Sequence, residues 1–459
     1  MKHTDIIQKL NLEQKCALLS GETVFTTRAL PGKGIPAITL SDGPNGVRKQ
    51  AGAADHLGLN PSVPATCFPT SSATACSWDE KLGEAVGEAL GEEAAAQEVA
   101  VLLGPGLNIQ RSPLCGRDFE YFSEDPILAG RMAAAYVRGI QKNGISACPK
   151  HFAVNSQELR RMASDSVLDE RTLRELYLTG FEIVVKEAKP KTIMTSYNLI
   201  NGTYANENAH LLQDILRKDW GFDGAVVTDW GGSNDHALGV KNGSTLEMPC
   251  PGGDSIRELM KAVQDGKISE ADVDARLDEM LELVLSTHAA VEKAPRTFDA
   301  AAHHKLARRA AAESIVLLKN EGGILPLKPN EKLAVIGDFA ETPRYQGAGS
   351  SAVNALQVDT LLDSIKADDS GITLVGYASG FERQGAADAE KLEEAVALAK
   401  KADTVLLCLG LDELRESEGL DRSDMKLAEN QQQLLAAVAA VNPNVVVLLS
   451  AGAPIETPW

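Results

Sequence analysis

Short apolar runs alternate with helical patterns through residues 1–292, and this alternation constrains the fold more than any other feature. Strands are predicted at 35–40, 66–73, 101–109, 145–152, 191–197, 224–229 and 244–248. Helices are predicted at 5–19, 80–100, 127–142, 208–218 and 269–291. This order is typical of parallel strands joined by crossover helices, and its length favours a closed barrel over an open sheet. We therefore predict an α/β protein whose N-terminal domain, residues 1–292, is a TIM-like (β/α) barrel.

A second, smaller α/β unit follows the barrel. Residues 293–312, rich in alanine and histidine, form the expected linker. Further along, strands are predicted at 333–337, 372–377, 404–410 and 445–450, with helices at 386–401 and 429–441. Four such strands predict a small doubly wound sheet, an α/β sandwich domain over residues 313–459. Because the sequence stops shortly after the last strand, we expect this domain to be incomplete.

Composition argues against several classes of partner. The formal net charge is −19, whereas nucleic acids and anionic membrane surfaces bind basic faces, so neither is expected as a partner. The first residues lack the apolar core of a signal peptide, and no apolar run is long enough for a transmembrane helix. We therefore expect a cytoplasmic protein.

Neither a metal nor a cofactor is expected. The seven cysteines are scattered and contain no Cys-x-x-Cys pair, which argues against both a disulfide framework and a zinc site. Histidines and carboxylates form no cluster with ligand spacing. Asp338 and Phe339 follow Val335-Ile336-Gly337 where a nucleotide-binding enzyme would have a Gly-x-Gly-x-x-Gly turn.

Residues 224–232, Gly-Ala-Val-Val-Thr-Asp-Trp-Gly-Gly, place a carboxylate at the tip of a predicted buried strand. In parallel α/β folds, catalytic groups gather at the carboxyl ends of the strands. Asp229 would be held there beside Trp230, and the glycines after it would let another group approach closely. On this stretch alone, a turn or N-cap aspartate is an equally good interpretation.

Polar side chains also fall at the other predicted strand ends, which would face the same mouth of the barrel. They are Asp42, the 108–117 loop, Lys150, His151, Tyr197, Asn198, Trp230 and Glu247. Directional donors and acceptors beside an aromatic ring suit a polyhydroxylated sugar, whose hydroxyls need hydrogen bonds and whose C–H faces stack on aromatic side chains. The set as a whole predicts a sugar site, although Lys150 and His151 alone would more often form a solvated strand edge.

Several long motifs run through both units. In the first unit they are Asn108-Ile-Gln-Arg-Ser-Pro-Leu-Cys-Gly-Arg117-Asp-Phe-Glu-Tyr-Phe-Ser-Glu-Asp125-Pro, Lys150-His-Phe-Ala-Val-Asn155-Ser-Gln-Glu158, Asp169-Glu-Arg-Thr-Leu-Arg-Glu175, Thr195-Ser-Tyr-Asn198 and Val227-Thr-Asp-Trp230. In the second unit they are residues 313–327 and Glu416-Ser-Glu-Gly-Leu-Asp-Arg422. In this order the motifs resemble glycoside hydrolase family 3, and the β-glucosidases of that family are the best match.

The resemblance implies a retaining, exo-acting β-glucosidase that acts on a small-molecule or oligosaccharide β-glucoside. It implies that Asp229 is the nucleophile and that a second-domain glutamate, matching Glu418, is the acid/base, with Glu416 as the fallback. The sugar at the cleavage subsite would be held by Asp42, Arg117, Lys150, His151, Arg161 and Tyr197, with Trp230 as a wall shared with the next subsite.

Retaining hydrolysis needs two carboxyl groups roughly 5–5.5 Å apart, one ionised to attack C1 and one protonated to release the leaving oxygen. We expect Lys150 or Arg161 to keep Asp229 ionised. We expect the carboxylates crowded between residues 412 and 424 to raise the pKa of the acid/base. Without the family motif, a cluster of this kind is more often a solvated loop.

Other functions stay open at this point. A β-xylosidase of the same family is the first alternative, because selection against a hydroxymethyl group cannot be read from the sequence. An inactive sugar-binding fragment is the second, because family members usually complete the second domain and often add a fibronectin-like one. A homo-oligomer or a complementing C-terminal chain would then be the partner. The N-acetylglucosaminidase branch is disfavoured, because the 155–165 loop lacks the histidine of that branch's Asp-His pair.

Overall fold

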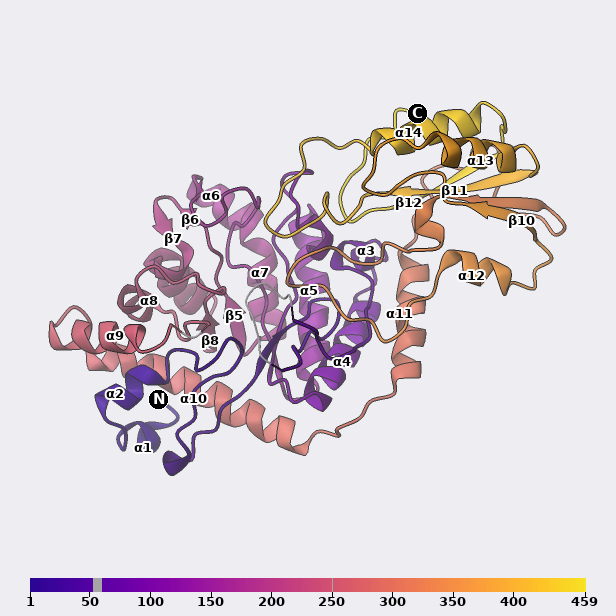
Figure 1. Cartoon of the computed structure of the whole chain (residues 1–459). Coiled ribbons are helices and arrows are strands. Elements are labelled where there is room, and N and C mark those ends of the chain that lie inside the picture. The colour runs from indigo at the N-terminus through magenta and orange to yellow at the C-terminus, as the bar shows by residue number, and fades with distance from the viewer. Residues whose placement is uncertain (53–59, 250) are drawn as a thin grey trace.

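The computed structural model describes residues 1–52, 60–249 and 251–459, which form two α/β units connected through a long helix (Figure 1). The first unit is built on short strands: β1 (Leu40–Asp42), β2 (Val101–Leu103), β3 (Ser146–Ala147), β5 (Thr192–Met194) and β8 (Ala225–Val227). Every side chain in these strands except that of Asp42 is buried, as expected for strands covered on both faces.

The strands of the first unit pair in parallel and in chain order. β1 pairs with β2, β2 with β3, and β5 with β8. A parallel bridge between Phe152 and Thr195 joins the segment after β3 to β5, and further parallel bridges continue from β8 through residues 246–247 to Ser20. This is the order of a (β/α) barrel. The pairings among the described residues do not close the ring, so closure itself stays a prediction.

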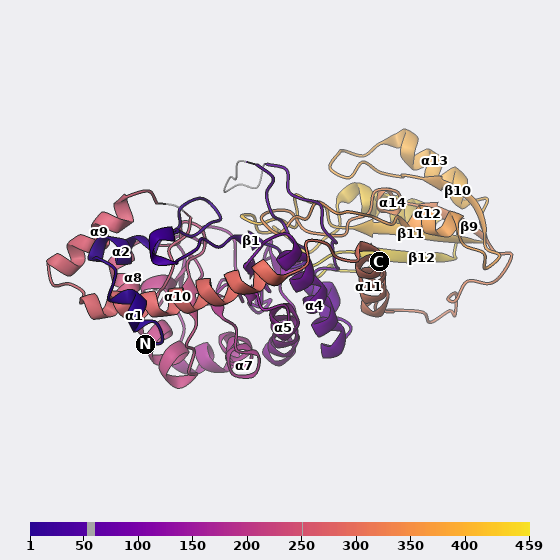
Figure 2. The same cartoon turned by 90° about the horizontal axis from the view of Figure 1, so that it is seen from below.

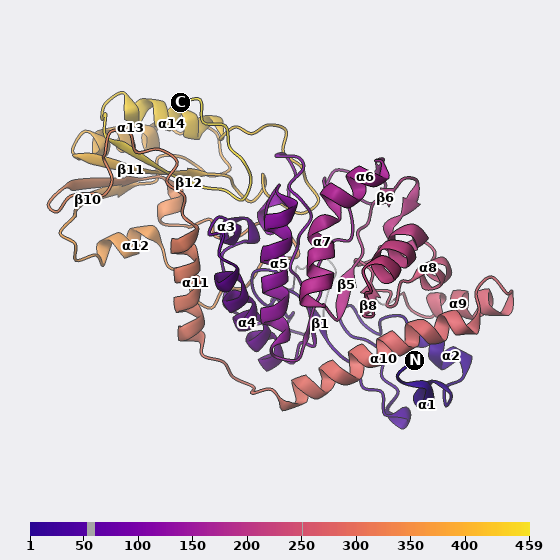
Figure 3. The same cartoon turned by 180° about the vertical axis from the view of Figure 1, so that it is seen from behind.

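Helices cover the outside of these strands, with α4, α5 and α7 side by side, and α10 runs across the unit against α1, α2 and α8 (Figures 2 and 3). The α-helices are α1 (Thr4–Ile7), α2 (Leu12–Ala17), α3 (Ser71–Ala75), α4 (Glu80–Ala96), α5 (Pro126–Gln141), α6 (Glu170–Thr172), α7 (Thr179–Ile183), α8 (His236–Asn242), α9 (Asp254–Gln264) and α10 (Glu270–Lys293). Segments Leu173–Tyr177, Val184–Ala188 and His210–Asp219 are π-helical. A small separate sheet contains β4 (Asp165–Ser166), β6 (Leu199–Ile200) and β7 (Thr203–Tyr204).

Three local predictions for this unit are wrong. The single helix at 5–19 is divided into α1 and α2, because Asn11 caps α2 and exchanges hydrogen bonds with Gln14. The strand at 66–73 is replaced by an extended segment and α3, whose small side chains are buried against neighbouring helices. Residues 244–248 contribute bridges rather than a regular strand.

The second unit contains the predicted doubly wound sheet. Its strands are β9 (Lys332–Ile336), β10 (Thr373–Ala378), β11 (Thr404–Gly410) and β12 (Val445–Ser450), all parallel in the order β10-β9-β11-β12. Helices α13 (Ala389–Ala399) and α14 (Glu429–Ala439) lie on one face, and α12 (Leu361–Lys366) lies on the other (Figures 1 and 3). Each unit has its own hydrophobic core.

The connection between the units is mostly helical, because α11 (Ala300–Ser314) occupies most of the predicted linker. Within the described ranges, every helix is too short or too polar to cross a bilayer. Loops of the second unit extend over the first (Figure 1). In the 342–356 loop, Val353 joins the core of the first unit, and Leu356 donates a backbone hydrogen bond to the carbonyl oxygen of Ala65 at 2.9 Å. These loops bring second-unit side chains to the strand ends of the first unit.

Candidate active site

Asp229 lies directly beyond the carboxyl end of β8. Its Oδ1 accepts a hydrogen bond from the backbone N–H of Trp230 at 2.8 Å. The indole N–H of Trp230 donates to the carbonyl oxygen of Val24 at 2.7 Å, and the Tyr197 hydroxyl donates to the carbonyl oxygen of Trp230 at 2.8 Å. The Trp230 ring lies 5.4 Å from the ring of Phe25. The loop therefore presents a carboxylate beside a fixed aromatic wall.

Lys150 and His151 follow β3 and are only 2% and 1% exposed, so they do not form a solvated strand edge. The Nζ of Lys150 lies 3.9 Å from Oδ1 of Asp42 at the end of β1. The Nε2 of His151 lies 3.6 Å from Oδ2 of Asp229. Three strand ends thus bring together two carboxylates, an ammonium group and an imidazole.

Tyr121 contacts one ring nitrogen of His151, and Asp229 lies near the other. The Tyr121 hydroxyl lies 3.0 Å from Nδ1 of His151 and accepts a hydrogen bond from the side chain of Asn155 at 3.2 Å. Burial, together with the charge of Arg117, lowers the pKa of His151 well below its ordinary value. His151 is thus neutral, and its Nε2 faces Asp229.

Tyr121 was not among the residues predicted for the site, although it stands inside the 108–126 motif. The only sequence signal for it was that position, because nothing in the sequence links a tyrosine in that motif to the histidine of another.

Glu418 reaches the cluster from the second unit and lies between two guanidinium groups. Arg161 donates to its Oε1 at 2.8 Å, and NH1 of Arg117 lies 3.6 Å from the same oxygen. Oε2 accepts a hydrogen bond from the backbone N–H of Ser350 at 2.8 Å. A Cβ at Gly349 would lie 2.4 Å from Cβ of Glu418, so only glycine permits this approach of the 342–356 loop.

The pKa of Glu418 is shifted in the direction opposite to the predicted one. Burial alone would raise it, but the charges of Arg117 and Arg161 and the hydrogen bonding from Ser350 hold it well below its ordinary value. The carboxylates that were expected to raise it have partners elsewhere: Glu413 with Arg383 at 3.0 Å, Glu416 with the N–H of Gly452 at 2.7 Å, and Asp421 with backbone N–H groups of the first unit. The predicted rise is wrong because arginines of the first unit dominate the field at Glu418.

Glu416, the fallback for the acid/base, points into the second unit. It is 1% exposed, and its Oε2 lies 3.5 Å from NH2 of Arg344. A parallel bridge between Ala348 and Ser417 keeps this part of the loop extended, so Glu416 and Glu418 project to opposite sides. The contacts therefore favour Glu418 over Glu416 as the glutamate that faces Asp229.

Burial raises the pKa of both carboxyl groups at the mouth of the first unit. The charges of Arg161, Arg117 and Lys150 oppose this rise at Asp229, which is the direction expected for Lys150 and Arg161. Burial raises the pKa of Asp42 to about 6, again against Lys150. Arg161 also lies over the ring of Tyr197, which was predicted to hold the sugar, with its Cζ 4.8 Å from the ring centroid.

Two residues of the predicted strand-end set have partners outside this cluster. Oε2 of Glu247 lies 3.4 Å from Nδ1 of His236, and the side chain of Asn198 donates to the carbonyl oxygen of Ala153 at 3.2 Å. The described part of the chain has no group of three or more His, Cys, Asp or Glu residues arranged to hold a metal ion.

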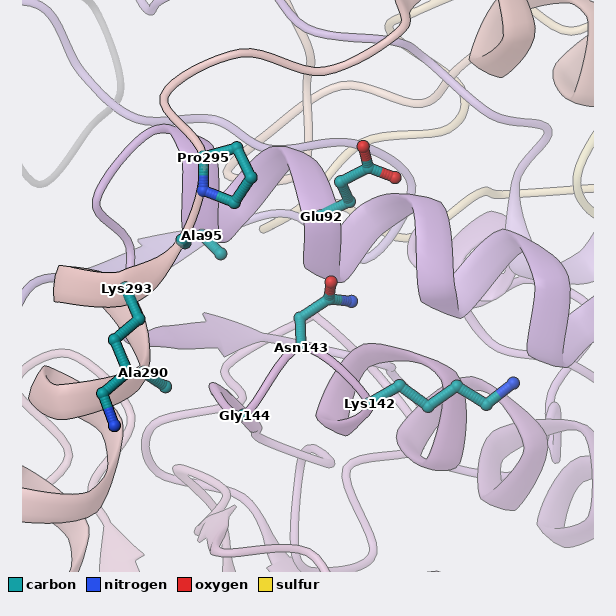
Figure 4. Close-up of a pocket in the computed structure, with 9 residues that line it drawn as sticks. Glu92, Ala95, Lys142, Asn143, Gly144, Ala290, Lys293 and Pro295 are labelled. Atoms are coloured by element: carbon teal, nitrogen blue, oxygen red, sulfur yellow. The ribbon is translucent and has the colours of Figure 1, made fainter.

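Two surface cavities lie outside the Asp229 cluster. One, of about 340 Å³, lies among the ends of α4, α5 and α10 (Figure 4) and is lined by residues that include Glu92, Lys142, Asn143 and Lys293. It lies where α5 returns toward β3, at the opposite end of the unit from the carboxyl ends of the strands. The other, of about 500 Å³, follows the 342–352 segment and is lined by Arg48, Arg344, Arg383 and Glu413 among others.

Asp118, in the 3₁₀ turn Asp118–Glu120, is a buried carboxyl group near the Glu418 loop. Neither of its side-chain oxygens has a hydrogen-bond partner among the described residues. Burial raises its pKa from 3.8 to about 8, and the charge of Glu416 adds to the rise. The folded chain therefore retains a proton that the unfolded chain loses, so stability falls as the pH rises between these two values, by about 1.4 kcal/mol per pH unit.

Asp118→Asn removes this titration and tests it directly. Near pH 4 we expect the variant to unfold at a temperature close to that of the wild type, whereas near pH 8.5 its Tm should be higher by several degrees, because the full titration corresponds to about 6 kcal/mol. Thermal unfolding followed by circular dichroism across this pH range measures both values. A variant with a lower Tm than the wild type at every pH would contradict the buried, protonated state of Asp118.

Comparison with known proteins agrees with this arrangement of fold and site. Residues 56–283 match the model of the glycosyl hydrolase family 3 N-terminal domain, and residues 315–459 match that of its C-terminal domain. The chain belongs to glycosyl hydrolase family 3.

The names of the curated relatives state more than one activity. Thermostable beta-glucosidase B of Acetivibrio thermocellus is 46% identical over 99% of this chain and 60% of its own length. Exo-alpha-(1->6)-L-arabinopyranosidase of Bifidobacterium longum is 45% identical over 99% of this chain and 61% of its own length. The chain thus spans about three fifths of the length of these relatives.

Solved structures of the family superpose closely. A GH3 beta-glucosidase of Bifidobacterium adolescentis gives a TM-score of 0.91 at 43% identity and covers 98% of this chain and 64% of that one. Beta-glucosidase 3B of Thermotoga neapolitana, solved with α-D-glucose, gives 0.89 at 32% identity and covers 100% of this chain and 70% of that one. The α/β fold with an N-terminal and a C-terminal domain is confirmed.

Proposed function

We propose that this chain acts as a retaining, exo-acting β-glucosidase that hydrolyses terminal non-reducing β-D-glucosyl residues through a covalent glycosyl-aspartate intermediate. The observation that carries the proposal is the shared arginine pair. Arg117 and Arg161 contact Glu418, and their charges also oppose the rise that burial causes in the pKa of Asp229. A carboxylate from each unit therefore faces one cationic centre, beside the aromatic wall of Trp230.

In the first step, Asp229 attacks C1 while Glu418 protonates the leaving oxygen, and in the second step Glu418 removes a proton from the attacking water. Asp229 is suited to attack because the charges of Arg161, Arg117 and Lys150 favour its ionised form. In the tautomer with its proton on Nε2, His151 donates a hydrogen bond to a sugar hydroxyl near Asp229. Asp42, whose Oδ1 lies 3.9 Å from Nζ of Lys150 at the end of β1, provides an acceptor for the sugar.

Glu418 must be protonated in the first step and ionised in the second, and the contact with Arg161 favours the ionised form. While Arg161 donates to Oε1, Glu418 is held ionised, which is the form required of the base in the second step. Sugar hydroxyls that bind to Arg117 and Arg161 divert these donors from Glu418 and allow its pKa to rise for the first step. Binding of the sugar is therefore coupled to protonation of Glu418 in this proposal.

Two other sugar specificities remain candidates. A β-xylosidase would use the same carboxylates with a pocket that excludes the hydroxymethyl group. An α-L-arabinopyranosidase is favoured by the name of the Bifidobacterium longum relative, which is 45% identical to this chain. Both substrates are pentopyranosides without a hydroxymethyl group, and the α-L-arabinopyranoside also has an axial C4 hydroxyl, so the choice depends on the space around C5 and on the contacts to the C4 hydroxyl.

Hydrolysis of three aryl glycosides separates these candidates. We expect kcat/KM to be highest for the β-D-glucoside and lower for the β-D-xyloside and the α-L-arabinopyranoside. A missing methylene in an apolar pocket is worth roughly 1–3 kcal/mol, or about 10–200-fold, and unpaired hydrogen-bonding groups around a missing hydroxyl add to this loss. A higher value for either pentoside would reassign the specificity, and hydrolysis of none of them would leave the sugar-binding fragment as the better proposal.

We also propose that the chain is cytoplasmic and that it associates with a second copy or with a complementing chain. The apolar run 315–318 is 55–79% exposed on all four side chains, and all six residues of the edge strand β12 are partly exposed. Surfaces of this kind support contact with a second copy or with a complementing chain. Light scattering on the eluting protein would report a mass above 48.8 kDa if copies associate.

A further inference from the structure

Asp421 binds the Glu418 loop to the first unit. Its carboxylate accepts hydrogen bonds from three backbone N–H groups that lie more than 260 residues earlier in the chain: those of Gly116 at 3.1 Å, Glu158 at 3.0 and 3.1 Å, and Leu159 at 2.8 Å. Hydrogen bonds to an ionised acceptor are roughly twice as strong as those between neutral groups. Asp421 therefore fixes two first-unit loops against the loop that carries Glu418.

Glu158 makes the corresponding contact from the first unit to the second. Its side chain is fully buried, and Oε2 accepts hydrogen bonds from the backbone N–H of Gly419 at 2.8 Å and from Arg161 at 2.8 Å. Oε1 accepts a further bond from the side chain of Asn155 at 3.3 Å. Each unit thus supplies one carboxylate to the backbone of the other, and the residue that Glu158 holds directly follows Glu418.

The two loops meet backbone to backbone. A Cβ on Gly116 would lie 1.7 Å from the carbonyl oxygen of Leu420, so no other residue fits at this position without separating the loops. The backbone N–H of Arg422 donates to the carbonyl oxygen of Leu114 at 2.8 Å. These contacts therefore fix how the two loops are aligned with each other.

We propose that Asp421 and Glu158 form a reciprocal latch between the two units that positions Glu418 for proton transfer. This inference rests on the proposed role of Glu418 as acid/base. Glu158 and Asp421 are positioning residues, because they touch the backbone around Glu418 and its partner Arg161. Each unit has its own core, so a weakened latch lets the loop move without unfolding either unit.

The latch matters because proton transfer tolerates little displacement. A misplacement of about 1 Å in a reacting group can cost about 10²-fold in rate. Glu418 is held by Arg161 and Ser350 only while its loop is docked, and the docking bonds lie at the next residue and at Asp421. Loosening the latch should therefore affect the protonation step more than sugar binding.

Asp421→Asn tests the latch, with Asp424→Asn as the matched control. In Asp421→Asn, an NH₂ group replaces one of the two oxygens that together accept from Gly116, Glu158 and Leu159, so at least one of these N–H groups meets a donor. Asp424 stands in the same loop but bonds the backbone N–H of Lys426 at 2.9 Å and pairs with Arg415 at 3.5 Å.

The first readout is the dependence of kcat/KM on the leaving group. We expect Asp421→Asn to slow alkyl β-glucosides at least tenfold more than dinitrophenyl β-glucoside, with KM changed less than threefold, and Asp424→Asn to match the wild type. An equal loss for all leaving groups, or no loss, would overturn the proposal. Glu158→Gln should give the same selective loss, and it serves as the test if Asp421→Asn does not fold.

The second readout does not depend on activity. Hydrogen exchange of the backbone amides, followed by mass spectrometry, should be faster in peptides covering 114–119, 156–161 and 416–422 of Asp421→Asn, and unchanged in Asp424→Asn. Unchanged exchange in Asp421→Asn would overturn the latch. If the wild-type chain hydrolyses no glycoside but exchange is faster in Asp421→Asn and unchanged in Asp424→Asn, the proposed function is removed while the latch is supported as a docking device.

Discussion

Asp229→Asn is expected to lower kcat for aryl β-glucosides by about four orders of magnitude or more. A neutral amide cannot attack C1, so the covalent route closes, and a loss of four decades corresponds to about 5.4 kcal/mol in the barrier. The substitution is nearly isosteric, and its carbonyl oxygen can still accept the hydrogen bond from the N–H of Trp230. We therefore expect the fold and the Tm to be nearly unchanged.

Asp235→Asn is the matched control for this variant. Asp235 lies on the same loop after β8 and caps α8 by accepting a hydrogen bond from the N–H of Leu238 at 2.8 Å. Asparagine caps helices about as well as aspartate, so activity should be retained. Steady-state kinetics with one aryl β-glucoside compares the two variants. A modest loss in Asp229→Asn, similar to that of the control, would remove Asp229 from the mechanism.

Glu418→Ala should give a loss that depends on the leaving group. For alkyl β-glucosides, which need a proton on the departing oxygen, kcat/KM should fall by about 10²–10⁴-fold, whereas an activated aryl glucoside needs little acid assistance and should lose much less. Azide should restore turnover of the activated substrate by replacing the base-assisted attack of water. The product should be the β-glucosyl azide, because both displacements invert at C1.

Glu413→Ala and Glu416→Ala separate this role from a general effect on the loop. Glu413 pairs with Arg383 at 3.0 Å, away from Asp229, so its variant should resemble the wild type. Glu416→Ala should lower the Tm, because it leaves Arg344 without a buried carboxylate partner. If azide rescued Glu416→Ala and not Glu418→Ala, the two assignments would have to be exchanged.

The sequence predicts most of the architecture because hydrophobic runs report burial directly. Ala225-Val226-Val227 is fully buried and parallel to β5, as its composition indicates, and all four strands of the second unit are confirmed. The errors fall where local polar contacts outweigh the apolar pattern. Asn11, for example, starts a new helix inside an otherwise continuous helical pattern.

The electrostatics of the site could not be predicted in the same way. The sequence places Glu418 among carboxylates, but the fold pairs each neighbour with another group and inserts Arg117 and Arg161 from the other unit. A pKa depends on which charges lie within a few ångströms, and that is fixed by contacts between distant segments. The contacts of Tyr121 and Asp421 could not be predicted for the same reason.

Covalent trapping with an activated 2-deoxy-2-fluoro-β-glucoside tests most directly whether Asp229 is the nucleophile of a retaining enzyme. The fluorine slows both steps, and a good leaving group lets the glycosyl-enzyme accumulate. We predict that digestion and mass spectrometry locate the fluoroglucosyl group on Asp229, within the peptide containing residues 224–232, and that Asp229→Asn takes up no label. A label on any other carboxylate, or turnover of the reagent by Asp229→Asn at the wild-type rate, would contradict the mechanism.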